Sequence, residues 1–192
     1  MIRDSVQAHR LPKVPPLVLV AALVVALAGC GGGGDEARPD TKTFRDDSFG
    51  ITFQYPDDFE RGEVTDVAQA AGGEPVARIA VRIDEDNALL ISKYILATAV
   101  TEANIEDSLS EIDGLVRRLS GQAARGRIVD VGGLPSVRYD DVNLTEPANG
   151  KSRLVFVFDR NNEYLVNCQS TPSERAKVDR ACDQALDTLA KS

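Results

Sequence analysis

The run RLVFVF within Ser152–Asp159 places the strongest constraint on the fold. Successive residues of a β-strand point to opposite faces, and every position from Leu154 to Phe158 is apolar. Such a strand is buried on both faces, so it lies at the centre of a sheet that is covered on both sides. We therefore expect a sheet with helices packed against each face.

Alternating polar and apolar residues predict the other strands of this sheet. Thr43–Tyr55 is typical of a hairpin, with turn residues between Asp46 and Gly50. Further strands are expected at Val76–Ile83, Leu89–Leu96, Gly126–Val131, Ser136–Leu144, Ser152–Asp159 and Glu163–Ser170. Leu89–Leu96 is also compatible with a helix, because its apolar run is short. The pairs Asn149-Gly150 and Asn161-Asn162 predict hairpin turns between the last three strands.

Two segments have the apolar periodicity of helices. Asn104–Leu119 has an apolar stripe, with Asn104 as the expected N-cap and Gly121 as the expected stop. Thr171–Glu174 matches a capping box with proline at the first helical position, and so predicts the start of a final helix. The inner stripe of that helix is Val178, Ala181, Cys182, Ala185 and Leu189. The expected fold class is α+β, a mostly antiparallel sheet of six to seven strands sandwiched by helices.

The N-terminal segment has the features of a bacterial export signal. Leu17–Ala28 is an uninterrupted apolar run, preceded by basic residues and too short for the roughly 20 residues of a membrane span. The following Leu27–Cys30 resembles the lipobox Leu-Ala-Gly-Cys, which implies cleavage before Cys30 and a diacylglycerol group on its sulfur. The alternative is an uncleaved anchor with an incidental cysteine. We expect a signal peptide at 1–29, a lipidated cysteine and flexible linker at 30–42, and a folded domain at 43–192.

Composition excludes several classes of function for the chain after the signal peptide. The whole chain has a net charge of −8, and removing a leader with three basic residues and one acidic residue leaves −10. Such a charge argues against nucleic acid as a partner. The one histidine, His9, lies in the leader, which excludes catalytic triads and histidine-ligated zinc in the domain. Cys168 and Cys182 remain as a pair, and in an exported protein they predict a disulfide.

The other candidate motifs are explained by ordinary turns and surface residues rather than by binding or catalytic sites. Asn149–Ser152 resembles the end of a phosphate-binding loop, but Thr145 replaces the required glycine and no helix follows. Asp84–Asn87 lacks the spacing of a calcium loop and is typical of a solvated turn. The remaining candidates are the adjacent acids Asp46-Asp47, Asp57-Asp58 and Asp140-Asp141 and the glycosylation pattern Asn143–Thr145. Neighbouring strand residues point to opposite faces, so the acid pairs do not predict a glycosidase site.

Three motifs together resemble the PsbP-like α/β/α sandwich, and more closely the LpqN-type bacterial lipoproteins. They are FGITFQYPDDF at Phe49–Phe59, GLPSVRY at Gly133–Tyr139, and YLVNCQS with ACDQAL between Tyr164 and Leu186. Phe59 stands where many relatives carry tryptophan. The resemblance implies a non-enzymatic binding or accessory module.

Together these features predict a protein without cofactor, metal or catalytic residues, anchored at the extracytoplasmic face of the membrane through the lipid on Cys30. Its expected partner is an envelope protein or a cell-wall component. The alternatives are a carboxylate-based envelope hydrolase and a carrier of an apolar ligand. The sequence predicts neither the ligand nor the oligomeric state.

Overall fold

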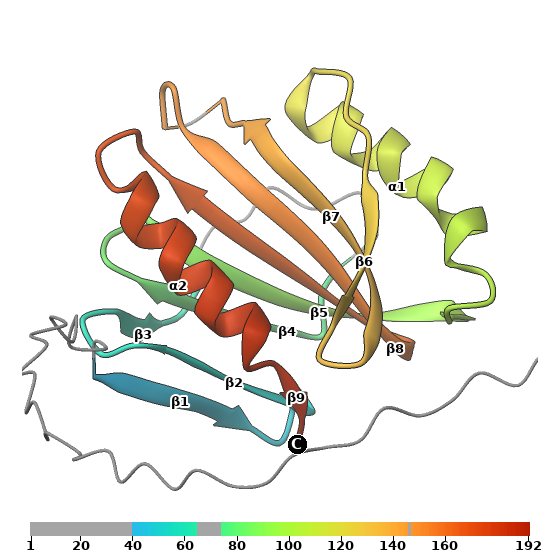
Figure 1. Cartoon of the computed structure of the whole chain (residues 1–192), viewed down its shortest axis with the longest axis horizontal. Helices are drawn as coiled ribbons and strands as arrows, with labels where there is room; N and C mark the ends of the chain where they lie inside the picture. The colour runs from blue at the N-terminus through green and yellow to red at the C-terminus, as the bar shows by residue number, and fades with distance from the viewer. Residues whose placement is uncertain (1–39, 65–73, 146) are drawn as a thin grey trace, which may run out of the picture. The chain divides into compact units, whose positions relative to one another are not determined.

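The computed structural model describes residues 40–64, 74–145 and 147–192, all within one compact unit, Ala37–Ser192 (Figure 1). One sheet has the order β1-β2-β9 and the other has the order β3-β4-β5-β8-β7-β6, with antiparallel pairing throughout. The smaller sheet consists of β1 (Thr41–Asp46), β2 (Ile51–Pro56) and β9 (Ala190–Lys191). The larger sheet consists of β3 (Glu60–Gly62), β4 (Ala77–Arg82), β5 (Ala88–Val100), β6 (Arg127–Val131), β7 (Leu134–Asn143) and β8 (Lys151–Ser170). The fold is therefore α+β, with two helices, α1 (Ile105–Ser120) and α2 (Arg175–Asp187), in this part of the chain.

Strand β8 occupies the centre of the larger sheet and folds back on itself. Its first half pairs with β7 and its second half with β5. The Ser152 hydroxyl donates a hydrogen bond to the Asn167 side-chain oxygen, 15 residues along the chain, and Figure 1 shows the two halves running side by side. The residue with positive φ at the reversal is Arg160, at 58°, so the predicted Asn161-Asn162 turn is displaced toward the N-terminus. The central position of the run RLVFVF is confirmed.

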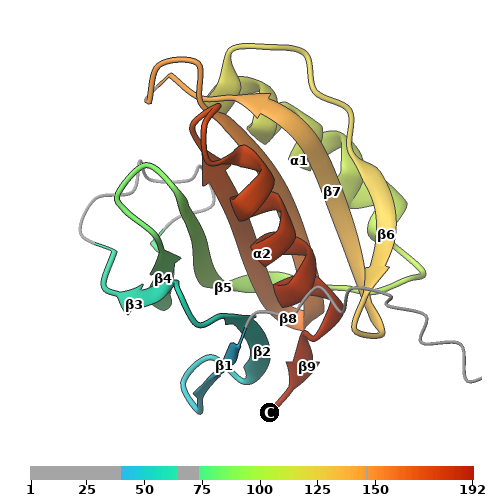
Figure 2. The same cartoon turned by 60° about the vertical axis from the view of Figure 1, so that its left-hand side comes forward.

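The two helices cover opposite faces of the larger sheet (Figure 2). Between the sheet and α2 lies the α2-side cluster, which also includes the inner residues of the smaller sheet. Its members include Phe44, Phe53, Phe59, Leu89, Ile91, Val155, Val157, Val166, Val178 and Leu189. Between the sheet and α1 lies the α1-side cluster, with Tyr94, Ile105, Ile112, Val116, Val137, Tyr139, Leu154, Phe156, Phe158 and Leu165 among its members. Successive side chains of β8 enter the two clusters in strict alternation. Because both faces of this strand are apolar, the sheet has to be covered on both sides.

The ends of the two helices show which of the predicted capping and stop residues act as expected. Gly121 ends α1 in a left-handed conformation, with φ 68°, as expected. Asn104 stands at the N-cap position of α1, but its side chain makes no capping bond and accepts instead from the Thr101 backbone N–H and hydroxyl. The prediction of a capping box at the start of α2 is wrong. Thr171 bonds the side chain of Asn87 instead, and the N-cap position is Glu174.

Several elements are set by pairing rather than by local pattern. β5 is a strand, and the hydrogen-bonded ladders to β4 and β8 on its two sides exclude the helical alternative. The short strands β3 and β9 carry too little periodicity to be predicted from the sequence. β6 and β7 are joined by Gly132-Gly133, both with positive φ, a turn that the sequence analysis missed. Within the described ranges, no helix is both long and apolar enough to cross a membrane.

Candidate functional site

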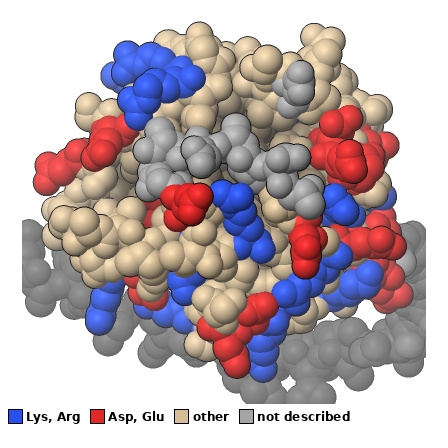
Figure 3. Space-filling view, turned by 180° about the vertical axis from the view of Figure 1, so that it is seen from behind, with Lys and Arg blue, Asp and Glu red and all other residues tan. Residues whose placement is uncertain are grey.

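A cleft of about 640 Å³ lies on the α1 side of the larger sheet, beyond the C-terminal end of the helix. Its floor comes from strands β4, β5, β7 and β8, and one wall comes from Leu119 and Ser120 at the end of α1. The apolar lining consists of Val64, Ala80, Ala88, Leu90, Leu119, Val142, Leu144, Leu154 and Leu165. The polar lining includes Glu63, Arg82, Glu85, Ser92, Tyr94, Ser120, Asn143, Thr145, Ser152, Asn167 and Gln169. Figure 3 shows the molecule from the side opposite to α2, with acidic and basic side chains interspersed.

Strand alternation and small side chains produce the hollow. Leu90 and Ser92 of β5 line the cleft, whereas Leu89 and Ile91 belong to the α2-side cluster. Ala88 on β5 and Ala80 on β4, which is the register partner of Leu90, also line the floor. Their methyl groups leave space that a larger side chain would fill.

The polar floor of the cleft is organised by Ser152 and Asn167. Ser152 is 2% exposed and donates its hydroxyl to the Asn167 side-chain oxygen across the two halves of β8. This bond fixes the orientation of the amide, whose nitrogen has no hydrogen-bond partner among the described residues. Gln169, next along the same face, donates to the Glu85 carbonyl at 3.1 Å. The cleft therefore presents amide donors beside an apolar surface.

The half-buried carboxyl group of Glu163 lies next to this cleft. Glu163 is the register partner of Tyr94, which lines the cleft, but Glu163 itself is not part of the lining. Burial raises the pKa of the Glu163 carboxyl to about 7, and the like charge of Glu111 on α1 contributes to the rise. Burial also raises the pKa of the Tyr94 hydroxyl. Glu163 was missed by the sequence analysis, because only the tertiary contact with α1 makes it unusual.

The adjacent acids are held in structural contacts away from the cleft. Hydrogen bonds from Ser48 lower the pKa of Asp46, which also pairs with Arg61 at 2.9 Å. Burial works to raise the pKa of Asp140, but its bonds with Arg138 and Arg127 outweigh this and lower it. The other ion pairs that involve these acids are Asp140 with Arg153, Asp58 with Lys177 and Asp141 with Arg175. None of the three acid pairs lines the cleft.

Of the remaining predicted positions, Glu85, Asn143, Leu144, Thr145 and Ser152 line the cleft, and the others lie outside it. Asp84 bonds the side chain of Asn87 within their turn, and Asn149 has φ 61° in the loop between β7 and β8. Asn143, at the end of β7, bonds Gln122 and Lys151. Within the described ranges, no three histidine, cysteine, aspartate or glutamate residues gather as a metal site.

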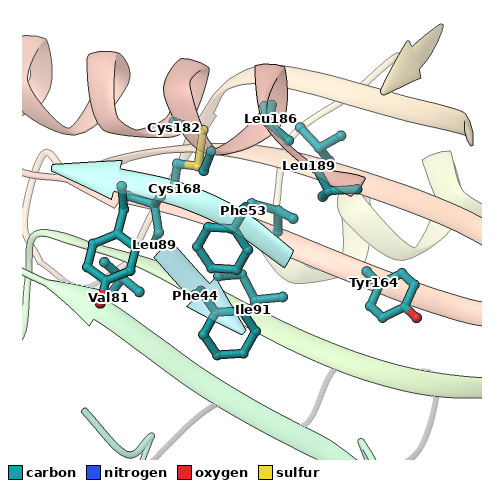
Figure 4. Close-up of a cluster of buried hydrophobic side chains, with 14 of the residues drawn as sticks. Phe44, Phe53, Val81, Leu89, Ile91, Tyr164, Cys168, Cys182, Leu186 and Leu189 are labelled. Atoms are coloured by element: carbon teal, nitrogen blue, oxygen red, sulfur yellow. A yellow bond between two sulfur atoms is a disulfide. The ribbon is translucent and has the colours of Figure 1, made fainter. Parts of the chain in front are cut away.

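Of the three cysteines singled out from the sequence, the structure describes Cys168 and Cys182. Cys168 and Cys182 form a disulfide with a Cα–Cα distance of 6.0 Å, which ties α2 to β8 (Figure 4). Both cysteines are buried in the α2-side cluster. Cys30 and the rest of the predicted leader lie outside the described residues.

Comparisons with solved structures identify the fold. The chain is similar to cyanobacterial PsbP (CyanoP) from Synechocystis sp. PCC 6803, with a TM-score of 0.51 and 15% identity, covering 86% of this chain and 99% of that one. It is also similar to a protein from Bacteroides thetaiotaomicron VPI-5482, with a TM-score of 0.53 and 15% identity, covering 79% of this chain and 48% of that one. The chain thus spans about half of the Bacteroides protein. No protein-family model and no curated protein matches the sequence. The structural likeness shows a PsbP-like fold.

Proposed function

We propose that this chain is a lipoprotein of the LpqN type, anchored through Cys30 at the extracytoplasmic face of the membrane, that binds a small amphipathic ligand without converting it. The cleft on the α1 side is the observation that carries this proposal. Its volume, about 640 Å³, falls in the range of about 300–1,000 Å³ that small-molecule sites occupy.

The lining of the cleft supports an amphipathic ligand over a wholly apolar one. Leu90, Leu154 and Leu165 offer a surface for a hydrocarbon body, and the Asn167 amide offers hydrogen-bond donors beside it. A purely apolar ligand would cover the half-buried Asn167 amide without offering it a hydrogen-bond partner, at a cost of about 1–3 kcal/mol.

The placement of the carboxylates supports binding over hydrolysis. A carboxylate hydrolase needs two acids converging on the bond that breaks, one of them with a raised pKa. Among the carboxyl groups of the described residues, that of Glu163 has a raised pKa, and it lies outside the lining of the cleft.

A fluorescence titration with the neutral probe N-phenyl-1-naphthylamine tests the binding site. The unit Ala37–Ser192 contains both hydrophobic clusters and is suited to expression without the leader. We expect saturable binding that Leu90→Trp weakens by at least about tenfold, because the indole fills the cleft. Ile95→Trp is the matched control, since Ile95 is 59% exposed on the opposite face of the same strand. Absence of saturable binding, or equal effects of the two variants, would refute the ligand site. An envelope-protein partner would then be the better hypothesis.

Membrane fractionation of cells that express the full chain tests the anchor. We expect Cys30→Ser to release the protein from membranes or to stall removal of the leader, because the sulfur is the predicted attachment point. Cys168→Ser tests whether loss of a cysteine elsewhere has the same effect. A Cys30→Ser protein that fractionates and migrates like the wild type would contradict the anchor.

A further inference from the structure

We propose that the ligand of the cleft is an acidic amphiphile, whose carboxylate or phosphate head group binds the Arg82 guanidinium while its hydrocarbon body lies on the floor. The inference rests on the proposed function in treating the cleft as the ligand site. It adds the chemical class of the ligand and the residue that selects it.

Arg82 lies on the cleft face of β4. Its register partner on β5 is Ala88, which lines the cleft, and directly opposed residues of an antiparallel pair share a face of the sheet. Arg82 is half-buried and is the basic residue of the cleft lining. Its guanidinium forms no ion pair or hydrogen bond with any described residue. A guanidinium presents its N–H donors as a planar fork, which matches a carboxylate or phosphate in two parallel hydrogen bonds.

The neighbouring strand positions the guanidinium over Gly62 of β3. A Cβ atom at Gly62 would lie 3.1 Å from Arg82 Nε and 3.2 Å from Arg82 Cζ, so the guanidinium occupies the space that another side chain would fill. The φ of Gly62 is not positive, so the backbone itself does not require glycine there. The Arg82 side chain passes its own register partner, Glu60, and reaches the row of Gly62 and Ala80. Because Ala80 lines the floor, this places the positive charge at the cleft.

The register of the sheet determines what lies next to the charge. From Gly62, the residues that follow across the sheet on this face are Ala80, Leu90 and Asn167. Neighbouring strands are about 4.8 Å apart, so Leu90 lies about 10 Å from Gly62 and Asn167 about 14 Å. A head group bound to Arg82 therefore leads directly onto the apolar surface of Ala80 and Leu90. The Asn167 amide contacts an oxygen atom further along the ligand.

The acidic residues near Arg82 are more exposed than Arg82 itself. Glu63 and Glu85 are the acids of the lining, and both are exposed, as is Glu60. Water solvates exposed carboxylates, and salt screens their charge beyond about 8 Å at physiological ionic strength. Arg78, on the same face of β4, adds a second half-buried positive charge, and its Nε is buried without a hydrogen-bond partner. The half-buried charges on this face of β4 thus favour an anion.

Isothermal titration calorimetry with decanoate tests the head group in the unit Ala37–Ser192. Decanoate is ionised near neutral pH, and it is titrated below its micelle concentration. We expect decanoate to bind at least about tenfold more tightly than decyltrimethylammonium, which has the same chain and the opposite charge. Acetate, which has the head group without the hydrocarbon body, should give no measurable binding.

Three variants connect this preference to Arg82. Arg82→Gln should weaken decanoate binding at least about tenfold, while binding of the neutral probe N-phenyl-1-naphthylamine stays within about twofold of the wild type. Retained probe binding also shows that the variant is folded with its cleft intact. Gly62→Ala should weaken decanoate binding by a smaller factor, because it keeps the charge but displaces the guanidinium. Arg180→Gln is the matched control, since it removes the same charge from an exposed position of α2, on the other side of the sheet, and should leave decanoate binding unchanged.

Two results would overturn the proposal: a decanoate affinity no greater than that of decyltrimethylammonium, or a decanoate affinity that Arg82→Gln leaves unchanged. Either result together with saturable binding of N-phenyl-1-naphthylamine retains the proposed ligand site and refutes only its acidic head group. Absence of binding by the probe and by both decyl compounds refutes the ligand site and the head group together.

Discussion

At the scale of single residues, Asn87 links two segments that lie far apart in the chain. It is 3% exposed, and its side-chain oxygen accepts hydrogen bonds from the Thr171 N–H at 2.8 Å and the Thr171 hydroxyl at 3.0 Å. Its amide nitrogen donates to Asp84 at 2.9 Å. One buried amide thus joins the β4–β5 turn to the segment that leads into α2.

We expect Asn87→Ala to lower the free energy of unfolding by about 2 kcal/mol, because it removes the acceptor of the Thr171 N–H and the bond between this turn and the segment before α2. Urea denaturation measures the loss. Asp86→Ala is the matched control, since Asp86 is exposed in the same turn, and it should change stability by less than about 0.5 kcal/mol. Equal stability of the Asn87→Ala variant and the wild type would show that the link is not stabilising.

At the scale of elements, the β6–β7 hairpin depends on two glycines with different surroundings. Gly132 and Gly133 have φ values of 61° and 76°. A Cβ atom at Gly132 would lie 2.2 Å from the Leu189 carbonyl oxygen, whereas one at Gly133 would meet nothing within 4 Å.

Gly133→Ala should therefore cost only the left-handed backbone strain of about 1–2 kcal/mol. We expect Gly132→Ala to cost more, because the backbone after α2 must also move. Thermal unfolding of the two variants gives the comparison. A larger loss for Gly133→Ala would contradict the close approach of this hairpin to Leu189.

The disulfide links α2 covalently to β8. Cys168 and Cys182 are 14 residues apart, and a loop of this length contributes about 3 kcal/mol in the chain-entropy account. We expect the Cys168→Ala, Cys182→Ala double variant to lose about this much stability in denaturant unfolding. Ala181, also buried on α2, provides the control: Ala181→Ser should disturb the same helix face while leaving the bond intact. A double variant as stable as the wild type would contradict a stabilising role of the disulfide.

At the scale of the whole molecule, the carboxyl groups predict how stability varies with pH. The folded-state pKa of Glu163 is raised from 4.5 to about 7, so the native state binds this proton more tightly than the unfolded chain. The resulting stability is fully present below pH 4.5 and is lost as pH rises through 7. The pKa values of Asp46 and Asp140 are lowered, so their contribution is instead lost in strong acid.

We therefore expect maximal stability in mildly acidic solution and a decline of up to about 3 kcal/mol toward pH 8. Urea denaturation at pH 4.5, 6 and 8 measures this decline. Glu163→Gln should remove most of it, whereas Glu106→Gln should not. Stability that rises from pH 4.5 to pH 8 in the wild type would contradict the assignment of the raised pKa to Glu163.

The sequence alone determined the features that depend on residues close together in the chain. The alternation in RLVFVF determined the doubly covered central strand, and the apolar stripe of α1 with Gly121 determined that helix and its end. These patterns are reliable because burial of one face of an element depends on the period of that element. These local patterns were sufficient to predict the fold class and the hairpin between the two halves of β8.

Only the tertiary structure decided the contacts between distant residues. Asn87 overrides the capping box at Thr171 across 84 positions, and the reversal at Arg160 follows from the pairing of β8 with β5 and β7. The cleft collects residues from four strands and the end of α1, while the environment of Glu163 depends on a helix some 50 positions earlier. Space left unfilled and charge left unpaired are properties of packing, and no local pattern of residue types encodes them.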